Sequence, residues 1–215
     1  MIDRPEGCFI TLEGGEGTGK STQLPLMASY LRDKGLDVVE TREPGGSPGA
    51  EKIRDLLVHG PTDRWDTITE TMLHFAARRE HLERTIRPAL GRGAWVVCDR
   101  FIDSTMAYQG YGMGVSLGII DHLSGMTVGS LKPDLTIVLD IPPEIGLKRA
   151  DDRKAGGTRY EQMDMAFHTR LRDGFMNIAK QEPDRCVILD ATASIEEIAE
   201  QIRQHIDSRL MAARS

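Results

Sequence analysis

Residues 14–22 read GGEGTGKST, and this stretch decides the fold. It matches the phosphate-binding pattern G-x-x-x-x-G-K-[S/T] in full. The apolar run 8–13, which has the length of a buried strand, leads into it, and a segment with a helical pattern follows it. The glycines let successive backbone N–H groups converge on phosphate oxygens, and the N-terminus of the following helix adds a favourable dipole. The sequence therefore predicts a strand, a cradle for a nucleoside triphosphate and a helix, in that order.

The side chains of this cradle have separate expected roles. Lys20 is expected to reach the β- and γ-phosphates, and the Ser21 hydroxyl is expected to ligate Mg²⁺. The residues expected to surround the triphosphate are Gly14, Gly15, Glu16, Gly17, Thr18, Gly19, Lys20, Ser21 and Thr22. Switch GTPases, motor ATPases and small-molecule kinases all use such a cradle. The chain contains no N-K-x-D motif for reading guanine, which disfavours a switch GTPase.

Strand and helix patterns alternate along the rest of the chain. Four more apolar runs have the length and branching of buried strands: residues 36–41, 94–99, 134–140 and 185–190. The clearest helical pattern is the last, where Ser194 and Glu197 form a capping box ahead of a stripe of isoleucines. This alternation predicts an α/β fold with a mostly parallel sheet covered on both faces. At 215 residues, the chain is expected to form a single domain, residues 1–215.

Composition argues against several classes of partner. The net charge of −6 and the pI near 5.6 disfavour a general nucleic-acid or membrane-surface binder. No apolar stretch approaches the ~20 residues that a membrane span needs, and the first residues do not read as a signal peptide. Three scattered cysteines without a C-x-x-C pair are typical of reduced thiols. We therefore expect a cytoplasmic protein with neither nucleic acid nor membrane as a partner.

Several arginines stand where a second, phosphate-bearing substrate would bind. They are Arg42, Arg54, Arg78 and Arg100. Asp99 is the last residue of the run 94–99 and Arg100 directly follows it, at the carboxyl edge of the sheet where ligands bind in such folds. Asp99 is expected to orient Mg²⁺ through water, and Arg100 offers a planar fork of donors to a phosphate. Arg78 lies one helical turn beyond His74, so the two side chains are expected to share a face.

The segment 150–161, ADDRKAGGTRYE, differs from its surroundings. It is charged, contains two glycines and has no apolar period. This composition is that of an exposed, mobile loop such as a lid, and a plain solvated loop is the alternative.

Two further motifs are more specific than the cradle. T-R-E-P-G-G occupies residues 41–46, and D-R-F followed by S-T-M-A-Y-Q occupies residues 99–109. The other segments that match in order and spacing are FITLEGGEGTGKST (9–22), MLHFAARREHL (72–82), PDLTIVLDIPPEIGLKRA (133–150) and TRYEQ (158–162). On these segments the chain resembles the thymidylate kinase family over nearly its whole length.

The resemblance implies an architecture and a reaction. The implied fold is a three-layer α/β/α P-loop kinase with a five-stranded parallel sheet in the order 2-3-1-4-5 and a lid at about residues 149–161. The implied reaction transfers the γ-phosphoryl group of Mg·ATP to dTMP, giving dTDP and ADP for dTTP biosynthesis, in a homodimer. A kinase of another nucleoside monophosphate or of a nucleoside is the alternative enzyme. A nucleotide-dependent switch is the alternative from another class of protein.

The resemblance also implies an acceptor pocket. Its residues would be Glu16, Arg42, Pro44, Arg54, His74, Phe75, Arg78, Arg100, Ser104, Thr105, Tyr108 and Gln109. Arg78 would donate to O4 of thymine, where cytosine carries an amino group, while Gln109 and Thr105 would contact the base edge. The family usually has a phenylalanine stacked on the base where this chain has His74, so either His74 or its neighbour Phe75 is expected to stack, and His74 is the favoured candidate.

The remaining implied roles concern the sugar, the phosphates and the transfer itself. Tyr108 would fill the space of a ribose 2′-hydroxyl, and Arg54 and Arg100 would hold the monophosphate. Glu16 would face the acceptor, bound to the sugar 3′-hydroxyl or to a water of the Mg²⁺ shell. Some members carry a catalytic arginine where this chain has Gly17, so Arg153 of the lid would supply that charge. The implied catalytic residues are Glu16, Lys20, Arg100 and Arg153, and the implied metal-site residues are Ser21, Asp99 and Glu161.

Overall fold

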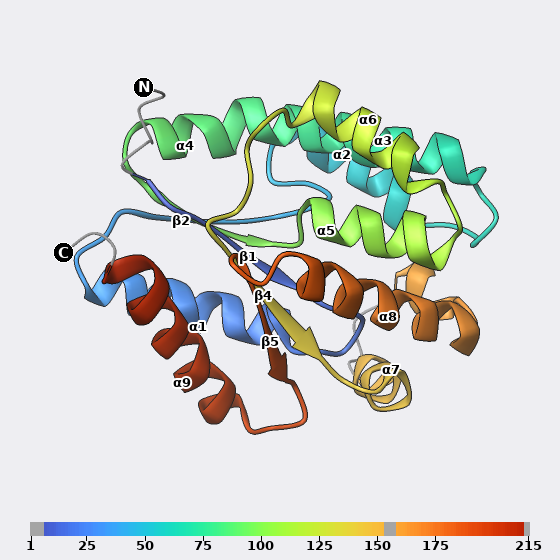
Figure 1. Cartoon of the computed structure of the whole chain (residues 1–215). Coiled ribbons are helices and arrows are strands. Elements are labelled where there is room, and N and C mark those ends of the chain that lie inside the picture. Colours follow the sequence, from blue (N-terminus) through green and yellow to red (C-terminus); the bar gives the residue numbers. More distant parts are fainter. Residues whose placement is uncertain (1–6, 153–157, 213–215) are drawn as a thin grey trace.

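A five-stranded parallel sheet forms the centre of the protein (Figure 1). The computed structural model describes residues 7–152 and 158–212. The strands are β1 (Phe9–Glu13), β2 (Val38–Arg42), β3 (Trp95–Asp99), β4 (Leu135–Asp140) and β5 (Cys186–Asp190). Their order is β2-β3-β1-β4-β5, and every neighbouring pair is parallel. Both the order and the positions of the five strands confirm the predictions.

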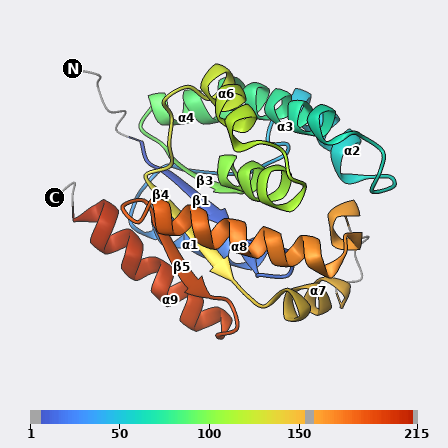
Figure 2. The ribbon, with the colours of Figure 1, turned by 45° about the vertical axis from the view of Figure 1, so that its right-hand side comes forward.

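Helices cover both faces of this sheet and complete the predicted three layers. The helices are α1 (Lys20–Asp33), α2 (Pro48–Val58), α3 (Thr67–His81), α4 (Arg87–Gly91), α5 (Ile102–Thr105), α6 (Leu117–Thr127), α7 (Pro143–Asp151), α8 (Met165–Gln181) and α9 (Ile195–Ile206). Shorter helical turns are η1 (Leu82–Ile86), η2 (Met106–Gly112), η3 (Arg159–Gln162) and η4 (Asp207–Met211). In Figures 1 and 2, α1 and α9 lie on one face, and the other face carries α3, α4, α5 and α8.

The alternation of side chains along the strands divides the core between the two faces. Ile10 and Leu12 of β1 point to the side of α1 and α9, where they join the largest buried apolar cluster. Phe9 points to the opposite side and packs with Leu82 and Ile86 of η1. Because both faces of the sheet are covered, the central strand reads as a continuous apolar run. This explains why the strands could be located from the sequence.

The carboxyl ends of the strands meet at one edge of the sheet, and the loops that bind ligands begin there. The glycine-rich stretch joins β1 to α1, and β3 runs directly into α5. Figure 2 shows β4 leading toward α7 at the same edge. Within the described residues, no helix combines the length and the apolar character required to cross a membrane.

Candidate active site

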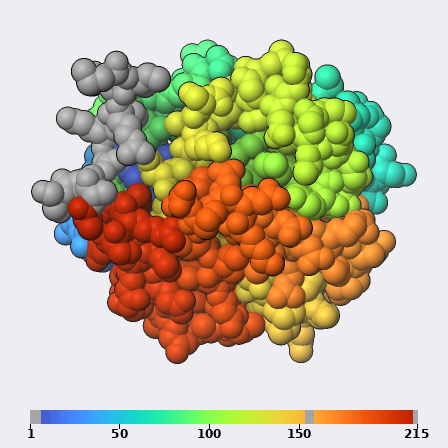
Figure 3. All heavy atoms as spheres, viewed as in Figure 1, coloured from blue at the N-terminus to red at the C-terminus, as the bar shows by residue number. Residues whose placement is uncertain are grey.

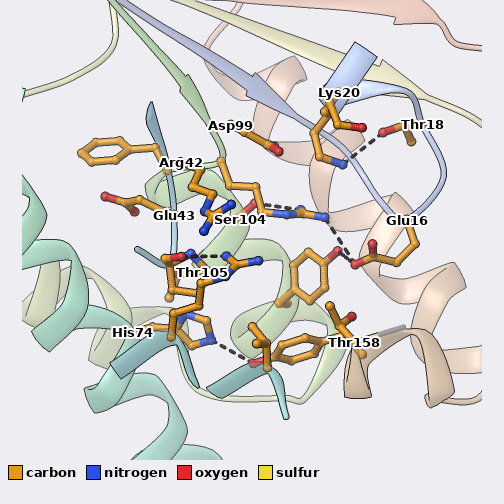
Figure 4. Close-up of a pocket in the computed structure, with 18 of the residues that line it drawn as sticks. Glu16, Thr18, Lys20, Arg42, Glu43, His74, Asp99, Ser104, Thr105 and Thr158 are labelled. Carbon is orange, nitrogen blue, oxygen red and sulfur yellow. Dashed lines mark hydrogen bonds and ion pairs between the residues drawn. The ribbon is translucent and has the colours of Figure 1, made fainter. Parts of the chain in front are cut away.

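One cavity of about 290 Å³ joins the glycine-rich loop to the ends of β2 and β3 (Figure 4). The predicted site residues that line it are Glu16, Gly17, Thr18, Gly19, Lys20, Ser21, Arg42, Pro44, Arg54, His74, Arg78, Asp99, Arg100, Ser104, Thr105, Tyr108, Gln109 and Glu161. Residues that line it without having been singled out from the sequence are Glu43, Val58, Phe101, Ala150, Thr158 and Tyr160. The structure therefore brings the triphosphate cradle and the expected acceptor residues into a single space.

Five predicted residues are not placed in this cavity. Gly14 and Gly15 face a smaller cavity behind the glycine-rich loop. Thr22 is exposed on the first turn of α1 and is not among the described residues of the cavity wall. Phe75 packs in an apolar cluster, as described below. Arg153 lies outside the described residues.

The glycine-rich loop presents the start of α1 to the cavity. Gly19, at φ 91°, is the residue before the helix, and no side chain of the described residues caps the helix there. The first N–H groups of a helix have no partner within it, so they are available to an anion. The Nζ of Lys20 donates to the carbonyl oxygens of Gly14 at 3.0 Å and of Gly15 at 2.7 Å. Burial and the nearby Arg100 lower the pKa of Lys20 to about 8.

Glu16 faces away from the start of α1, toward the acceptor end of the cavity (Figure 4). Its Oε1 accepts hydrogen bonds from the hydroxyl of Tyr108 at 2.6 Å and from Nη2 of Arg100 at 3.3 Å. Burial alone would raise the pKa of Glu16, but the charges of Arg100 and Lys20 outweigh it, and the pKa lies below its ordinary value. An ionised carboxylate inside a phosphate-binding loop is therefore balanced by two cations.

The conformation of Arg100 is fixed by its backbone torsion angle and by hydrogen bonds of the residues that follow it. Its φ of 69° is left-handed, which costs a residue with a side chain about 1–2 kcal/mol. The next N–H, of Phe101, donates to Oε1 of Glu13 at 2.7 Å, and the hydroxyl of Ser104 donates to Oε2 of Glu13 at 2.6 Å. Nη1 of Arg100 in turn donates to the oxygen of Ser104 at 3.1 Å. Glu13 thus fixes the bend that aims Arg100 into the cavity.

Glu13 is a functional residue that the sequence analysis missed. It is fully buried at the end of β1, and burial, together with the carboxylate of Asp103, raises its pKa to about 7. The available signal was a carboxylate at the end of an otherwise uncharged strand, directly before the glycine-rich loop.

Arg78 lies at the far end of the cavity and is almost fully buried. Its Nε donates to Oε2 of Glu43 at 2.7 Å, and its Nη2 donates to the hydroxyl oxygen of Thr105 at 2.9 Å and to the carbonyl oxygen of Phe101 at 3.0 Å. Its Nη1 is buried and has no hydrogen-bond partner among the described residues. A guanidinium with one unused donor nitrogen, which carries two N–H groups, is suited to a ligand oxygen when it lies in a cavity wall.

The positions of His74 and Phe75 distinguish the two candidates for the residue that faces the base. His74 lines the cavity, and its Nε2 lies 2.9 Å from the hydroxyl of Tyr160. Burial lowers the pKa of His74 to about 3, so the imidazole is neutral. Phe75 packs instead with Val115 and Ile120, because successive residues of a helix point in different directions. Among the described residues, Phe75 is therefore a core residue and not part of the cavity wall.

The residues expected at the metal site fit a hydrated magnesium ion. Ser21 and Glu161 line the cavity, and Oδ1 of Asp99 is buried without a hydrogen-bond partner in the described part of the chain. The described residues contain no cluster of three or more His, Cys, Asp or Glu side chains of the kind that encloses a metal. Mg²⁺ in phosphate-transfer sites is held mainly by phosphates and water with one or two protein oxygens, so the arrangement suits that ion.

The glycine-rich loop and α7 are in direct backbone contact. Gly17 has a φ of 68°, and a Cβ on it would collide with the carbonyl oxygen of Gly146 in α7. A Cβ on Gly146 would collide in the same way with the carbonyl oxygen of Glu16. A side chain at position 17 therefore requires α7 to move away.

The described parts of the predicted lid do not form a single loop. Residues 149–151 end α7, and Arg149 donates to the carbonyl oxygen of Ala191 at 2.7 Å. Arg159 begins η3, is almost fully buried and forms an ion pair with Glu70. Both arginines are engaged in structural contacts, whereas Arg153 falls among residues 153–157, which are not described.

Comparison with known proteins gives a consistent result. The sequence model of the family "Thymidylate kinase" matches residues 12–202. A thymidylate kinase from Caulobacter vibrioides is 52% identical over 205 residues, which cover 95% of this chain and 98% of the relative. One from Bradyrhizobium sp. is 48% identical, covering 96% and 92%. The crystal structure of thymidylate kinase from Ehrlichia chaffeensis superposes with a TM-score of 0.77 at 36% identity, covering 93% of this chain and 98% of that one.

Proposed function

The chain belongs to the thymidylate kinase family, and we propose that it transfers the γ-phosphoryl group of Mg·ATP to dTMP, giving dTDP and ADP. One observation carries this proposal beyond family membership. A single cavity connects the start of α1, which suits a triphosphate, to the unused Nη1 donor of Arg78 at its other end. A hydrolytic switch has no need of a second pocket that ends in a hydrogen-bond donor.

The acceptor would lie between Arg78 and the glycine-rich loop. Nη1 of Arg78 would donate to O4 of thymine, and the neutral His74 would stack on the base. Arg54 lines the cavity, and its Nη1 donates to the carbonyl oxygen of Pro44 at 2.7 Å, which leaves further donors of the same fork for a phosphate. Arg100 would bind that phosphate from the opposite side.

The transfer itself requires positioning and charge neutralisation. An oxygen of the dTMP phosphate forms a bond to the γ-phosphorus while the bond from that phosphorus to the bridging oxygen of ADP breaks. Because the attacking oxygen is already ionised near neutral pH, the reaction needs no general base. Lys20 and the N–H groups of the loop would bind the β- and γ-phosphates. When bound, Mg²⁺ would neutralise phosphate charge, and Ser21, Asp99 and Glu161 are the residues that would hold it.

ADP release from Mg·ATP, measured with dTMP, dUMP, dCMP, dGMP, AMP or thymidine as acceptor, tests the proposal. We expect dTMP to switch on ADP production and dCMP to stay near background, because the donor of Arg78 would meet the amino group of cytosine. If one of the other five compounds were a better acceptor than dTMP, the protein would be a kinase of that nucleotide or nucleoside instead. ADP release without any acceptor would favour the switch class.

Arg153 is proposed as the cation that neutralises the transferring phosphoryl group. Supporting this, the backbone contact between Gly17 and Gly146 leaves no room for an arginine in the loop, and Arg149 and Arg159 are both engaged elsewhere. Replacing Arg153 with alanine is expected to lower kcat at least tenfold while the Kd for dTMP changes little, since the contact would form in the transition state. Equal losses in both quantities, measured by steady-state kinetics and calorimetry, would instead make Arg153 a ground-state binding residue.

We further propose that the enzyme works as a cytoplasmic homodimer. The three cysteines are free and buried, which suits a reducing compartment.

The surface proposed for the dimer lies on α3 and α6, which pack against each other. Their exposed apolar side chains are Ile68, Met72, Ile119 and Met126. The yellow-green atoms of α6 lie at the molecular surface in Figure 3. Light scattering is expected to give twice the chain mass of 23.9 kDa for the wild type and a lower mass for Met72→Asp. A monomeric wild type would refute the dimer.

A further inference from the structure

Glu70 of α3 is a buried carboxylate to which the proposed reaction assigns no role. Its side chain is almost inaccessible to solvent. Oε1 accepts hydrogen bonds from Nε2 of Gln109 at 2.8 Å and from the hydroxyl of Tyr160 at 2.9 Å, and Oε2 accepts from Nη2 of Arg159. Three segments that are far apart in the sequence, α3, η2 and η3, therefore meet at one carboxylate beside the cavity.

The carboxylate dictates how the amide of Gln109 is turned. An ionised carboxylate can only accept hydrogen bonds, so the nitrogen of Gln109 must face Glu70. The amide oxygen of Gln109 is then directed away from Glu70, and Gln109 is part of the cavity wall. Gln109 therefore offers the cavity an acceptor.

The same carboxylate also sets the proton position on His74. The hydroxyl of Tyr160 has one proton and gives it to Glu70, so its oxygen must accept from Nε2–H of His74, 2.9 Å away (Figure 4). Burial lowers the pKa of His74 to about 3, so the ring is neutral, and with Nε2 carrying the proton its Nδ1 is left as an acceptor. One carboxylate thus determines the hydrogen-bonding state of two side chains in the cavity wall.

We propose that Glu70 is a specificity-determining positioning residue, which fixes the donor and acceptor pattern that the pocket presents to the acceptor base. With Glu70 in place, Arg78 offers a donor and Gln109 offers an acceptor. A 4-oxopyrimidine, with an acceptor at O4 and a donor at N3–H, matches this pattern, and a 4-aminopyrimidine presents the reverse. The inference rests on the proposed function, because it concerns how the same pocket chooses its nucleotide.

The variant Glu70→Gln tests the inference with almost no change of shape. Arg159 can only donate, so the oxygen of the new amide must stay on its side, and the new nitrogen must face Gln109 and Tyr160. Gln109 then has to turn its oxygen toward the new nitrogen and its own nitrogen toward the cavity. We expect the ratio of kcat/KM for dTMP over dCMP to fall roughly 10- to 100-fold, because a matched hydrogen bond becomes a mismatched one. The KM for ATP is expected to stay within about twofold of the wild type.

Two further variants separate positioning from general damage. Glu80→Gln removes a charge from the exposed side of the same helix, where Glu80 pairs with Arg84, and should leave the ratio unchanged. The double variant Glu70→Gln with Gln109→Glu puts the carboxylate on the other side of the same hydrogen bond. It again offers the base an acceptor, so most of the lost ratio is expected to return.

The outcomes are distinguishable from a failure of the proposed function. A wild type without dTMP-dependent ADP release would remove the function itself. A wild type that prefers dTMP, together with an unchanged ratio in Glu70→Gln, would overturn only the role of Glu70, as would equal losses with both nucleotides. If the Glu70→Gln variant does not fold, neutron diffraction of the wild type with dTMP tests the inference instead, because it locates the deuterons on the amide of Gln109. It is expected to show the amide deuterons of Gln109 toward Glu70 and its oxygen toward N3, and the reverse orientation would overturn the inference.

Discussion

Replacing Lys20 with alanine is expected to lower kcat about 10²–10³-fold, the loss typical of removing one charge-stabilising donor from a catalytic site. Lys20 is buried at the start of α1, and its ammonium group is already turned toward the loop that would receive the triphosphate. No other lysine is among the described residues that line the cavity, so its charge has no substitute of the same kind. The measurement is dTMP-dependent ADP release at saturating ATP.

Lys34→Ala serves as the matched control for this prediction. Lys34 follows the last turn of the same helix and forms an exposed ion pair with Asp207, 3.2 Å away, which is worth little in water. The control is expected to keep full activity. If Lys20→Ala retained more than a tenth of the wild-type kcat, the phosphate contact assigned to Lys20 would be wrong.

Replacing Arg78 with methionine is expected to lower kcat/KM for dTMP on the order of 10³–10⁴-fold, because O4 of thymine would be buried without a donor. The change should also lower the free energy of unfolding by about 3–5 kcal/mol, since the buried carboxylate of Glu43 loses its guanidinium partner and keeps only its contact with Nδ1 of His81 at 3.0 Å. Kinetics below the melting temperature and chemical denaturation measure the two effects separately.

Two variants check that these effects have separate causes. Arg79→Met changes the neighbouring residue, whose exposed ion pair with Glu83 lies outside the cavity, and should leave both quantities nearly unchanged. Adding Glu43→Gln to Arg78→Met removes the buried charge that has lost its arginine partner, so stability should recover in part while activity stays low. Recovery of activity in that double variant would contradict a direct contact between Arg78 and the base.

The sequence was sufficient to predict those structural features that depend only on residues close together in the chain. Buried parallel strands are apolar on both faces, so their positions were predicted within two residues of their observed starts. The capping box is equally local: the side chain of Ser194 accepts from the N–H of Glu197, and the Glu197 carboxylate accepts from the N–H of Ser194. The glycine-rich loop could be identified from its own sequence pattern and its position between a predicted strand and a predicted helix.

The buried carboxylates could not be predicted in this way. Glu13, Glu43 and Glu70 are each satisfied by donors that lie more than thirty residues away in the chain. Charged residues are normally exposed, so nothing local marks these three as buried until the fold supplies their partners. The burial of Arg159 could not be predicted for the same reason. Arg159 lies in the charged, glycine-bearing segment 150–161, for which a lid was expected, but its partner is the carboxylate of Glu70 on α3.

The backbone contact between Gly17 and Gly146 also restricts how this enzyme can evolve. An arginine at position 17 is harmful unless α7 has first withdrawn, and withdrawing α7 alone opens a gap beside the loop without any benefit. The two positions are therefore epistatic, and each single step toward an arginine in the loop passes through a less fit intermediate. A lineage that has closed this contact cannot place an arginine in the loop without first moving α7.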